Sequence, residues 1–187
     1  CWLFVWHCWN DHCRSAVYNP QSNWQRILSG QFIYSVSYQK YLALSAIDFP
    51  AKLRHFVIDN TSTDVVQLAL QKNPFPEFSW TEILEQISGR QKAVDKLPTW
   101  FACAKVVYPS KISVEQTSSE TTAQYKSSLI SGNTLIDLTG GFGVDAYYFA
   151  HKIKQVVHCE FNAALSEIVR YNYEQLKVQN IECVSGD

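Results

Sequence analysis

The 187-residue sequence predicts an α/β fold in which a helical region precedes a doubly wound parallel sheet. The segment 134–145, TLIDLTGGFGVD, predicts it most directly, because a short apolar run leads through an acidic residue and a glycine-rich turn into a new helical pattern. Strand and helix patterns then alternate twice, as expected of parallel strands joined by right-handed crossovers. Before residue 130 the apolar residues recur mainly at helical spacing.

The composition is that of a globular protein, with 47% hydrophobic residues and a net charge of −1. This charge supplies no global basic field for nucleic acid, although a local basic patch is compatible with it. No apolar run has the length of a membrane span, and no secretory signal is present, so we expect a cytoplasmic protein with reduced cysteines. The sequence contains no Met and begins with Cys1, and its third predicted strand is its last. Because open α/β sheets usually have five or more strands, we predict a fragment that lacks its C-terminal half.

Residues 1–40 differ from the rest of the sequence, because they are rich in Trp, Cys and Tyr and show no clean periodicity. We expect this segment to be poorly ordered or loosely helical, and to be upstream sequence translated in error. Its histidines and cysteines, His7, Cys8, His12 and Cys13, match no standard zinc spacing and are followed by no second pair. No metal site is therefore predicted.

Residues 41–130 are predicted to form the N-terminal helical region. Ser79 is expected to cap one helix, with Glu82 at the capping-box position. Ser113–Gln116 reads as a second capping box, which opens a polar helix running to Lys126. That polar helix either lines a ligand cleft or is a surface helix rich in small residues.

A small basic cluster, Arg90, Lys92 and Lys96, lies within this helical region. It is interpreted either as a solvated helix face or as a contact for phosphate or RNA. Trp100 follows Leu97-Pro98 and is predicted to be a packing anchor rather than a stacking platform.

Residues 131–187 are predicted to form the first half of the sheet, ending after the third strand. The expected order is a strand at 135–138, a helix from Asp145 to about Ile153, a strand at 155–160, a helix capped by Asn162 and a strand at 181–184.

Ligands of such sheets bind beyond the carboxyl ends of the strands. The candidate cofactor-binding residues that fall there are Asp137, Thr139, Gly140, Gly141, Gly143, Asp145, Glu160 and Asp187. Glycines allow a ligand to approach the backbone closely. A carboxylate at Glu160, the end of the second strand, suits a ribose diol, and Asp187, at the end of the third, suits an adenine amino group.

Two ligand classes compete for this loop. A dinucleotide prefers G-x-G-x-x-G, and Gly141-x-Gly143-x-x-Ala146 is formally an allowed variant. However, Asp137 and Asp145 would place carboxylates beside a pyrophosphate, which is repulsive. S-adenosylmethionine carries no phosphate and has a cationic sulfonium, so the flanking carboxylates favour it over NAD.

The run DLTGGFGVDA, residues 137–146, resembles motif I of class I S-adenosylmethionine-dependent methyltransferases, whose sheet is Rossmann-like. The resemblance is strongest to a bacterial family with an N-terminal helical region and a C-terminal THUMP-like domain, and segments 86–100 and 108–126 resemble that family too. The loop is also similar to that of small-subunit ribosomal RNA guanine-N2 methyltransferases. In those enzymes an Asp and a Glu at the positions of Asp145 and Glu160 contact the cofactor.

The resemblance implies that Asp137 and residues 140–143 shape the methionine pocket, that Asp145 and Glu160 contact the cofactor, and that Asp187 reaches the adenine. It implies RNA, ribosomal or transfer, as the substrate. The family's catalytic motif on the fourth strand and its THUMP-like domain do not occur within the 187 residues, so no catalytic residue is named and the fragment is expected to be inactive alone. The alternatives are a non-catalytic nucleoside- or RNA-binding module and an NAD-dependent oxidoreductase.

Overall fold

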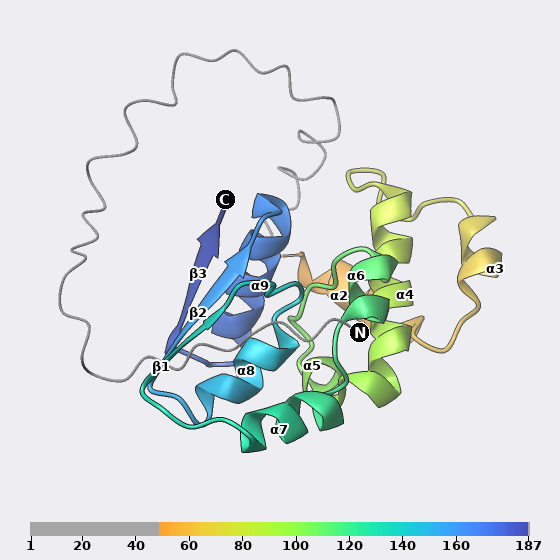
Figure 1. Ribbon diagram of the computed structural model, residues 1–187. Helices are drawn as coiled ribbons and strands as arrows, with labels where there is room; N and C mark the ends of the chain where they lie inside the picture. Colours follow the sequence, from red (N-terminus) through yellow and green to blue (C-terminus); the bar gives the residue numbers. More distant parts are fainter. Residues whose placement is uncertain (1–48, 187) are drawn as a thin grey trace, which may run out of the picture.

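The computed structural model describes residues 49–186 (Figure 1). The interpretation of residues 1–40, including their rejected metal pattern, lies outside this range. The described helices and strands are α2 (Ala51–Asp59), α3 (Val65–Ala69), α4 (Trp80–Lys96), α5 (Pro98–Ala102), α6 (Lys111–Gln116), α7 (Glu120–Ser128), β1 (Thr134–Asp137), α8 (Val144–Ala150), β2 (Gln155–Glu160), α9 (Ala163–Gln175) and β3 (Ile181–Ser185).

The three described strands form one parallel sheet in the order β1-β2-β3, as predicted. Leu135 pairs with Val156 and Asp137 with His158, so these four side chains lie on one face of the sheet. That face is buried against α8 and α9, whereas Ile136 on the opposite face is 54% exposed. Because both crossovers run in the same direction along the sheet, both helices fall on the same face.

The extended segment that contains Val107 and Tyr108 holds the helical region against the sheet. The Gln86 side-chain amide donates to the Tyr108 carbonyl at 2.6 Å and accepts from the Tyr108 N–H at 2.9 Å. The Asn172 amide does the same for Val107, at 2.8 and 2.9 Å. Among the described residues this segment pairs with no strand, so the two amides replace the backbone pairing that buried peptide groups require. They thereby link α4 to α9.

The main hydrophobic core draws side chains from both the helical region and the sheet. Trp100 is fully buried in it, which confirms the prediction of a packing anchor. A second, smaller cluster centres on Leu53, Leu68, Ile83 and Ile87 and holds α2, α3 and α4 together. None of the helices in residues 49–186 is long and apolar enough to cross a membrane.

The helix caps agree only in part with the predictions. Ser79 is the N-cap of α4, but its side chain makes no capping hydrogen bond. The capping box predicted at Ser113 is wrong, because Ser113 lies inside the short helix α6 and Thr117 then turns the chain into extended backbone. The polar helix α7 is instead capped by Ser119, whose hydroxyl accepts from the Thr122 N–H at 3.2 Å.

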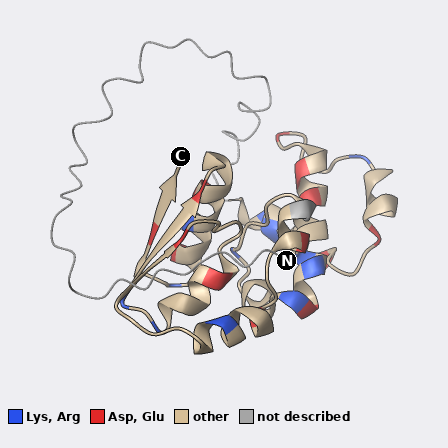
Figure 2. Cartoon of the chain, in the orientation of Figure 1, with Lys and Arg blue, Asp and Glu red and all other residues tan. Residues whose placement is uncertain are grey.

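The basic cluster does not form one solvated face, so that interpretation is wrong for Arg90. Its guanidinium lies 4.2 Å from the Phe101 ring centroid, and the residue is only 8% exposed. Lys92 pairs with the Glu115 carboxylate at 3.3 Å, and Lys96 donates to the Glu115 carbonyl at 2.6 Å. Basic and acidic residues are accordingly interspersed along α4 in Figure 2, rather than collected on one side.

Candidate functional site

The glycine-rich loop lies between β1 and α8, at the carboxyl edge of the sheet (Figure 1). The Gly140 N–H donates to the Cys159 carbonyl at 2.9 Å, and the Gly143 N–H donates to the Gly140 carbonyl at 2.9 Å. The Gly141 N–H donates to the Glu160 carboxylate at 3.0 Å. These bonds fix the loop against the end of β2, where the fold class predicts ligand binding.

The three glycines of the loop, Gly140, Gly141 and Gly143, do not all occupy their positions for the same physical reason. A Cβ on Gly140 would lie 2.2 Å from His158 Nε2, and one on Gly143, where φ is +80°, would lie 2.2 Å from the Tyr173 hydroxyl. Protein side chains therefore demand glycine at these two positions. Gly141 has φ +53°, and a Cβ there would meet no atom closer than the Thr139 carbonyl oxygen at 3.9 Å. Gly141 is thus the glycine whose surroundings leave room for a ligand.

Phe142 anchors the loop from the side of the helical region. Its side chain is 2% exposed, and its ring centroid lies 6.3 Å from those of Trp100 and Tyr108. On the other side, the Tyr173 hydroxyl donates to the Gly143 carbonyl at 2.8 Å. The loop is therefore held in one conformation before any ligand arrives, which lowers the entropy cost of binding.

His158 lies directly beneath Gly140 and did not figure among the predicted site residues. It is fully buried, and neither ring nitrogen has a hydrogen-bond partner among the described residues. Its ring packs edge-on against Tyr173, with centroids 5.9 Å apart. The two-residue alternation of β2 could have placed it on the covered face, two positions after buried Val156.

Asp137 is the last residue of β1, and its side chain bonds to the loop that follows. Its carboxylate accepts from the Thr139 N–H at 3.1 Å, so the predicted residue Thr139 enters the site through its backbone. Burial raises the pKa of Asp137 above its ordinary value, because it disfavours the charged form. The hydrogen bond from Thr139 opposes this rise, and the neighbouring charge of Asp145 adds to it.

Asp145 is held by α7 and by the residues that precede it. Its Oδ2 accepts from Lys126 Nζ at 2.7 Å and from the Ser118 hydroxyl at 2.9 Å. Its Oδ1 is buried and has no hydrogen-bond partner among the described residues. The polar helix α7 thus reaches the loop, which favours the cleft-lining interpretation, and Ser118 and Lys126 are site residues that the sequence did not single out. Lys126 is the basic residue of α7, a helix of mostly polar residues that begins with Glu120, and this was the sequence signal that could have pointed to it.

Glu160 ends β2 with both carboxylate oxygens engaged. One accepts from the Gly141 N–H at 3.0 Å and the other from the Asn162 N–H at 2.8 Å. Each oxygen has two lone pairs, so the carboxylate keeps acceptor capacity for a ligand. Asp137, the three glycines, Asp145 and Glu160 therefore meet around one loop. Asp187 lies outside the described residues.

No model of a known protein family matches the sequence, and no curated protein matches it. A solved structure does: the crystal structure of a presumed methyltransferase from Porphyromonas gingivalis W83, with 27% sequence identity and a TM-score of 0.61. The match covers 74% of this chain. The chain has a methyltransferase fold. It spans 36% of the length of that protein.

Metal ligation has no candidate in the described part of the chain. No group of three or more His, Cys, Asp or Glu side chains within residues 49–186 could hold a metal ion. The polar groups that the site offers to a ligand are its carboxylates, its backbone and Lys126.

Proposed function

We propose that this chain binds S-adenosylmethionine as the cofactor-binding part of a methyltransferase that acts on ribosomal or transfer RNA. The observation that carries the proposal is the loop 137–145, which has a carboxylate at each end and, at Asp145, a buried oxygen without a hydrogen-bond partner among the described residues. The 27% identity to a presumed methyltransferase supports the same class.

The residues around the loop fit this cofactor. Asp145 Oδ1 is an acceptor suited to an ammonium group, because a buried carboxylate oxygen without a partner carries a desolvation cost that such a donor would offset. Gly141 presents backbone with no side chain in the way. The Glu160 carboxylate, already oriented by two backbone amides, has lone pairs left for ribose hydroxyls.

The same carboxylates disfavour a dinucleotide. The charge of Asp145 lies close enough to Asp137 to add to the rise of the Asp137 pKa that burial causes. A pyrophosphate would add negative charge beside both, at a cost that grows as the dielectric falls. S-adenosylmethionine supplies a methyl group on a cationic sulfonium and brings no phosphate.

The contribution of this chain to methyl transfer is positioning. Lys126 and Ser118 orient the Asp145 carboxylate, and the backbone of Gly141 and Asn162 orients Glu160. Groups that are held before the ligand binds lose little entropy on binding, and alignment of a ligand is a large part of catalysis in such reactions.

RNA as the substrate rests on the resemblance of the loop and its preceding segments to RNA methyltransferases. This support comes from similarity of fold and motif. The Lys92 and Lys96 side chains, bonded to Glu115, add little to it.

Isothermal titration calorimetry of the 187-residue chain tests the cofactor. We expect heat with S-adenosylmethionine and S-adenosylhomocysteine and none with NAD, and loss of the signal in Asp145→Asn. Glu167→Gln is the matched control, since it removes a carboxylate that is exposed and pairs with Arg170 on the surface of α9. Heat with NAD but not with the sulfur cofactors would reject the proposal.

Binding of labelled RNA by fluorescence anisotropy tests the substrate class. We expect ribosomal or transfer RNA segments to bind more tightly than DNA of the same sequence. Equal affinity for the two nucleic acids would remove the support for RNA while leaving the cofactor proposal intact.

A further inference from the structure

The glycine-rich loop offers few donors to one group of the proposed cofactor. S-adenosylmethionine ends in an amino acid, so it carries a carboxylate and an ammonium group on the same carbon atom. The side chains around the loop are mainly acceptors, because Asp137, Asp145 and Glu160 all lie there. A further carboxylate is repelled by such groups, so it needs a hydrogen-bond donor or a positive charge.

The backbone of the loop is largely committed to the protein itself. Four of its N–H groups already donate to acceptors within the described residues: those of Thr139, Gly140, Gly141 and Gly143. Two of these acceptors are the carboxylates of Asp137 and Glu160, and the other two are backbone carbonyls. A ligand carboxylate therefore gains most from a donor on another element.

Lys126, in the last turn of α7, is a cation beside the loop with one donor to spare. Its Nζ donates to Asp145 Oδ2 at 2.7 Å and to the Ser118 hydroxyl at 2.9 Å. A lysine ammonium has three N–H donors, and these two bonds are the ones that it forms within residues 49–186. The side chain is 39% exposed, so its third N–H can meet a ligand.

The charge of Lys126 acts at both ends of the loop. It pairs with Asp145 at one end. At the other end, burial raises the pKa of Asp137 and the charge of Lys126 opposes that rise, so the two groups face each other. A ligand whose ammonium pairs with Asp145 would accordingly hold the carboxylate of the same carbon atom within reach of Lys126.

Helix α7 is fixed in a way that keeps Lys126 at the loop. It packs along α8 (Figure 1). In its first turn the buried Glu120 carboxylate accepts from the Thr99 N–H at 2.6 Å, from the Thr99 hydroxyl at 2.7 Å and from the Tyr148 hydroxyl. These bonds tie α7 to α5 and α8. The ammonium at the other end of α7 is therefore in place before a ligand arrives, which lowers the entropy cost of binding.

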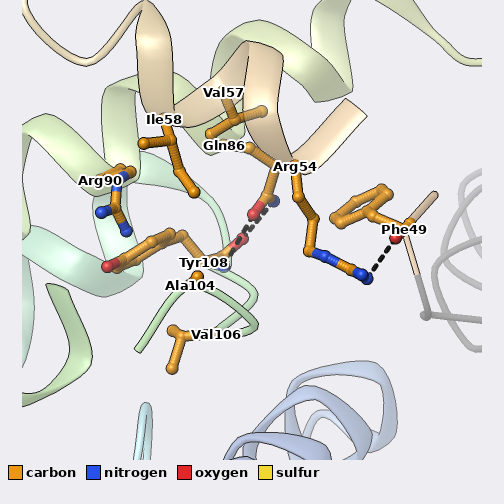
Figure 3. A pocket seen from close by; sticks show the side chains of 9 residues that line it. All are labelled: Phe49, Arg54, Val57, Ile58, Gln86, Arg90, Ala104, Val106 and Tyr108. Carbon is orange, nitrogen blue, oxygen red and sulfur yellow. Dashed lines mark hydrogen bonds between the residues drawn. The ribbon is translucent and has the colours of Figure 1, made fainter. Parts of the chain in front are cut away.

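The pocket between α2 and α4, shown in Figure 3, lacks such a meeting of opposite charges. Its Arg54 guanidinium donates to the Phe49 carbonyl, and Arg90 lies at the other end beside Tyr108. No acidic residue lines this pocket. A ligand group that carries both charges therefore fits the loop and Lys126 better than it fits this pocket.

We infer that Lys126 binds the carboxylate of the amino acid tail of S-adenosylmethionine, beside the Asp145 carboxylate that takes its ammonium group. The inference rests on the proposed function and names the residue that selects for the complete tail. The helical region thus takes part in recognition of the cofactor, in addition to packing against the sheet. A sulfur nucleoside that keeps the amine but lacks the carboxylate should bind less tightly.

Calorimetry with two ligands tests the inference: S-adenosylhomocysteine and its decarboxylated form, which keeps the amine and the nucleoside. The unmodified chain should bind S-adenosylhomocysteine about tenfold more tightly, which is the scale of a hydrogen bond to a charged group. In Lys126→Gln this preference should largely disappear. The loss of Lys126 also disturbs Asp145, but that disturbance affects both ligands and cancels in the ratio of their affinities.

Lys92→Gln is the matched control, because it also removes a lysine of the helical region from an ion pair, here with Glu115 at 3.3 Å. It should leave the ratio of the two affinities unchanged. If Lys126→Gln does not fold, spectra of the ¹³C-lysine-labelled chain take its place. The Lys126 Cε resonance, assigned by its loss in Lys126→Arg, should then shift more with S-adenosylhomocysteine than with the decarboxylated ligand.

The outcomes separate this inference from the proposed function. Equal affinity of the unmodified chain for the two ligands would overturn the inference and leave the proposed function intact. A preference that survives in Lys126→Gln, or an equal shift of the Lys126 resonance with both ligands, would have the same meaning. If neither ligand binds, the proposed function falls, and the inference falls with it.

Discussion

Replacing Gly140 with alanine should destabilise the protein strongly. The added methyl carbon would lie 2.2, 2.4 and 2.6 Å from three atoms of the His158 ring. That ring is fully buried and packs against Tyr173, so it has little room to move. Overpacking of a buried site costs about 1–3 kcal/mol, and contacts this short favour the upper end, about 3 kcal/mol. For a chain of this size, such a loss lowers the melting temperature by about 6–12 °C.

Urea and thermal unfolding followed by circular dichroism measure this loss, and the neighbouring glycine provides a control. Gly141→Ala adds the same methyl group where no atom lies within 3.9 Å, so it incurs only the strain of φ +53°, about 1–2 kcal/mol. His158→Ala removes the ring that causes the clash. In the double variant Gly140→Ala/His158→Ala, the penalty of the first change should therefore largely disappear.

Two results would refute this reasoning. One is a Gly140→Ala variant no less stable than Gly141→Ala, which would mean that the loop moves aside at little cost. The other is a penalty that remains undiminished when His158 is alanine. Either result would remove the packing explanation for glycine at this position.

Three further predictions concern the same loop. Phe142→Ala should lower the free energy of unfolding by about 3–5 kcal/mol, because it leaves a cavity beside Trp100. Leu138→Ala is the control and should change this free energy little, because the Leu138 side chain is 75% exposed. Equal urea midpoints for the two variants would contradict this prediction. Burial raises the pKa of Asp137, so the charged form destabilises the folded state and stability is lost as the pH rises from about 3.9 through the raised value. Above this pH range Asp137→Asn should therefore be more stable than the unmodified chain, and below it the two should be equally stable. Urea titrations across pH that showed the reverse order would contradict a raised pKa at Asp137. Glu160→Ala should weaken S-adenosylmethionine binding by about 1–3 kcal/mol in calorimetry, and an unchanged dissociation constant would count against its ribose role.

The sheet could be predicted because its signals are local. The predicted strands differ from the observed Thr134–Asp137, Gln155–Glu160 and Ile181–Ser185 by at most a residue at either end. Apolar runs bounded by glycine and asparagine mark their ends, and the Asn162 side chain caps α9 as expected, accepting from the Ala164 N–H at 3.0 Å. The position of Asp137, Asp145 and Glu160 around one loop follows from the same pattern, since parallel strands end at one edge.

The sequence by itself thus determined the order of the elements and which carboxylates share an edge. The tertiary structure alone decided which neighbours each side chain has, because the partners are far apart in the chain. Lys126 reaches Asp145 across 19 positions, and helical spacing could not reveal that Phe101 covers Arg90. The loop shows the same division: its glycines were visible in the sequence, but Gly140 is required by the ring of His158, and only the paired strands bring that ring beneath it.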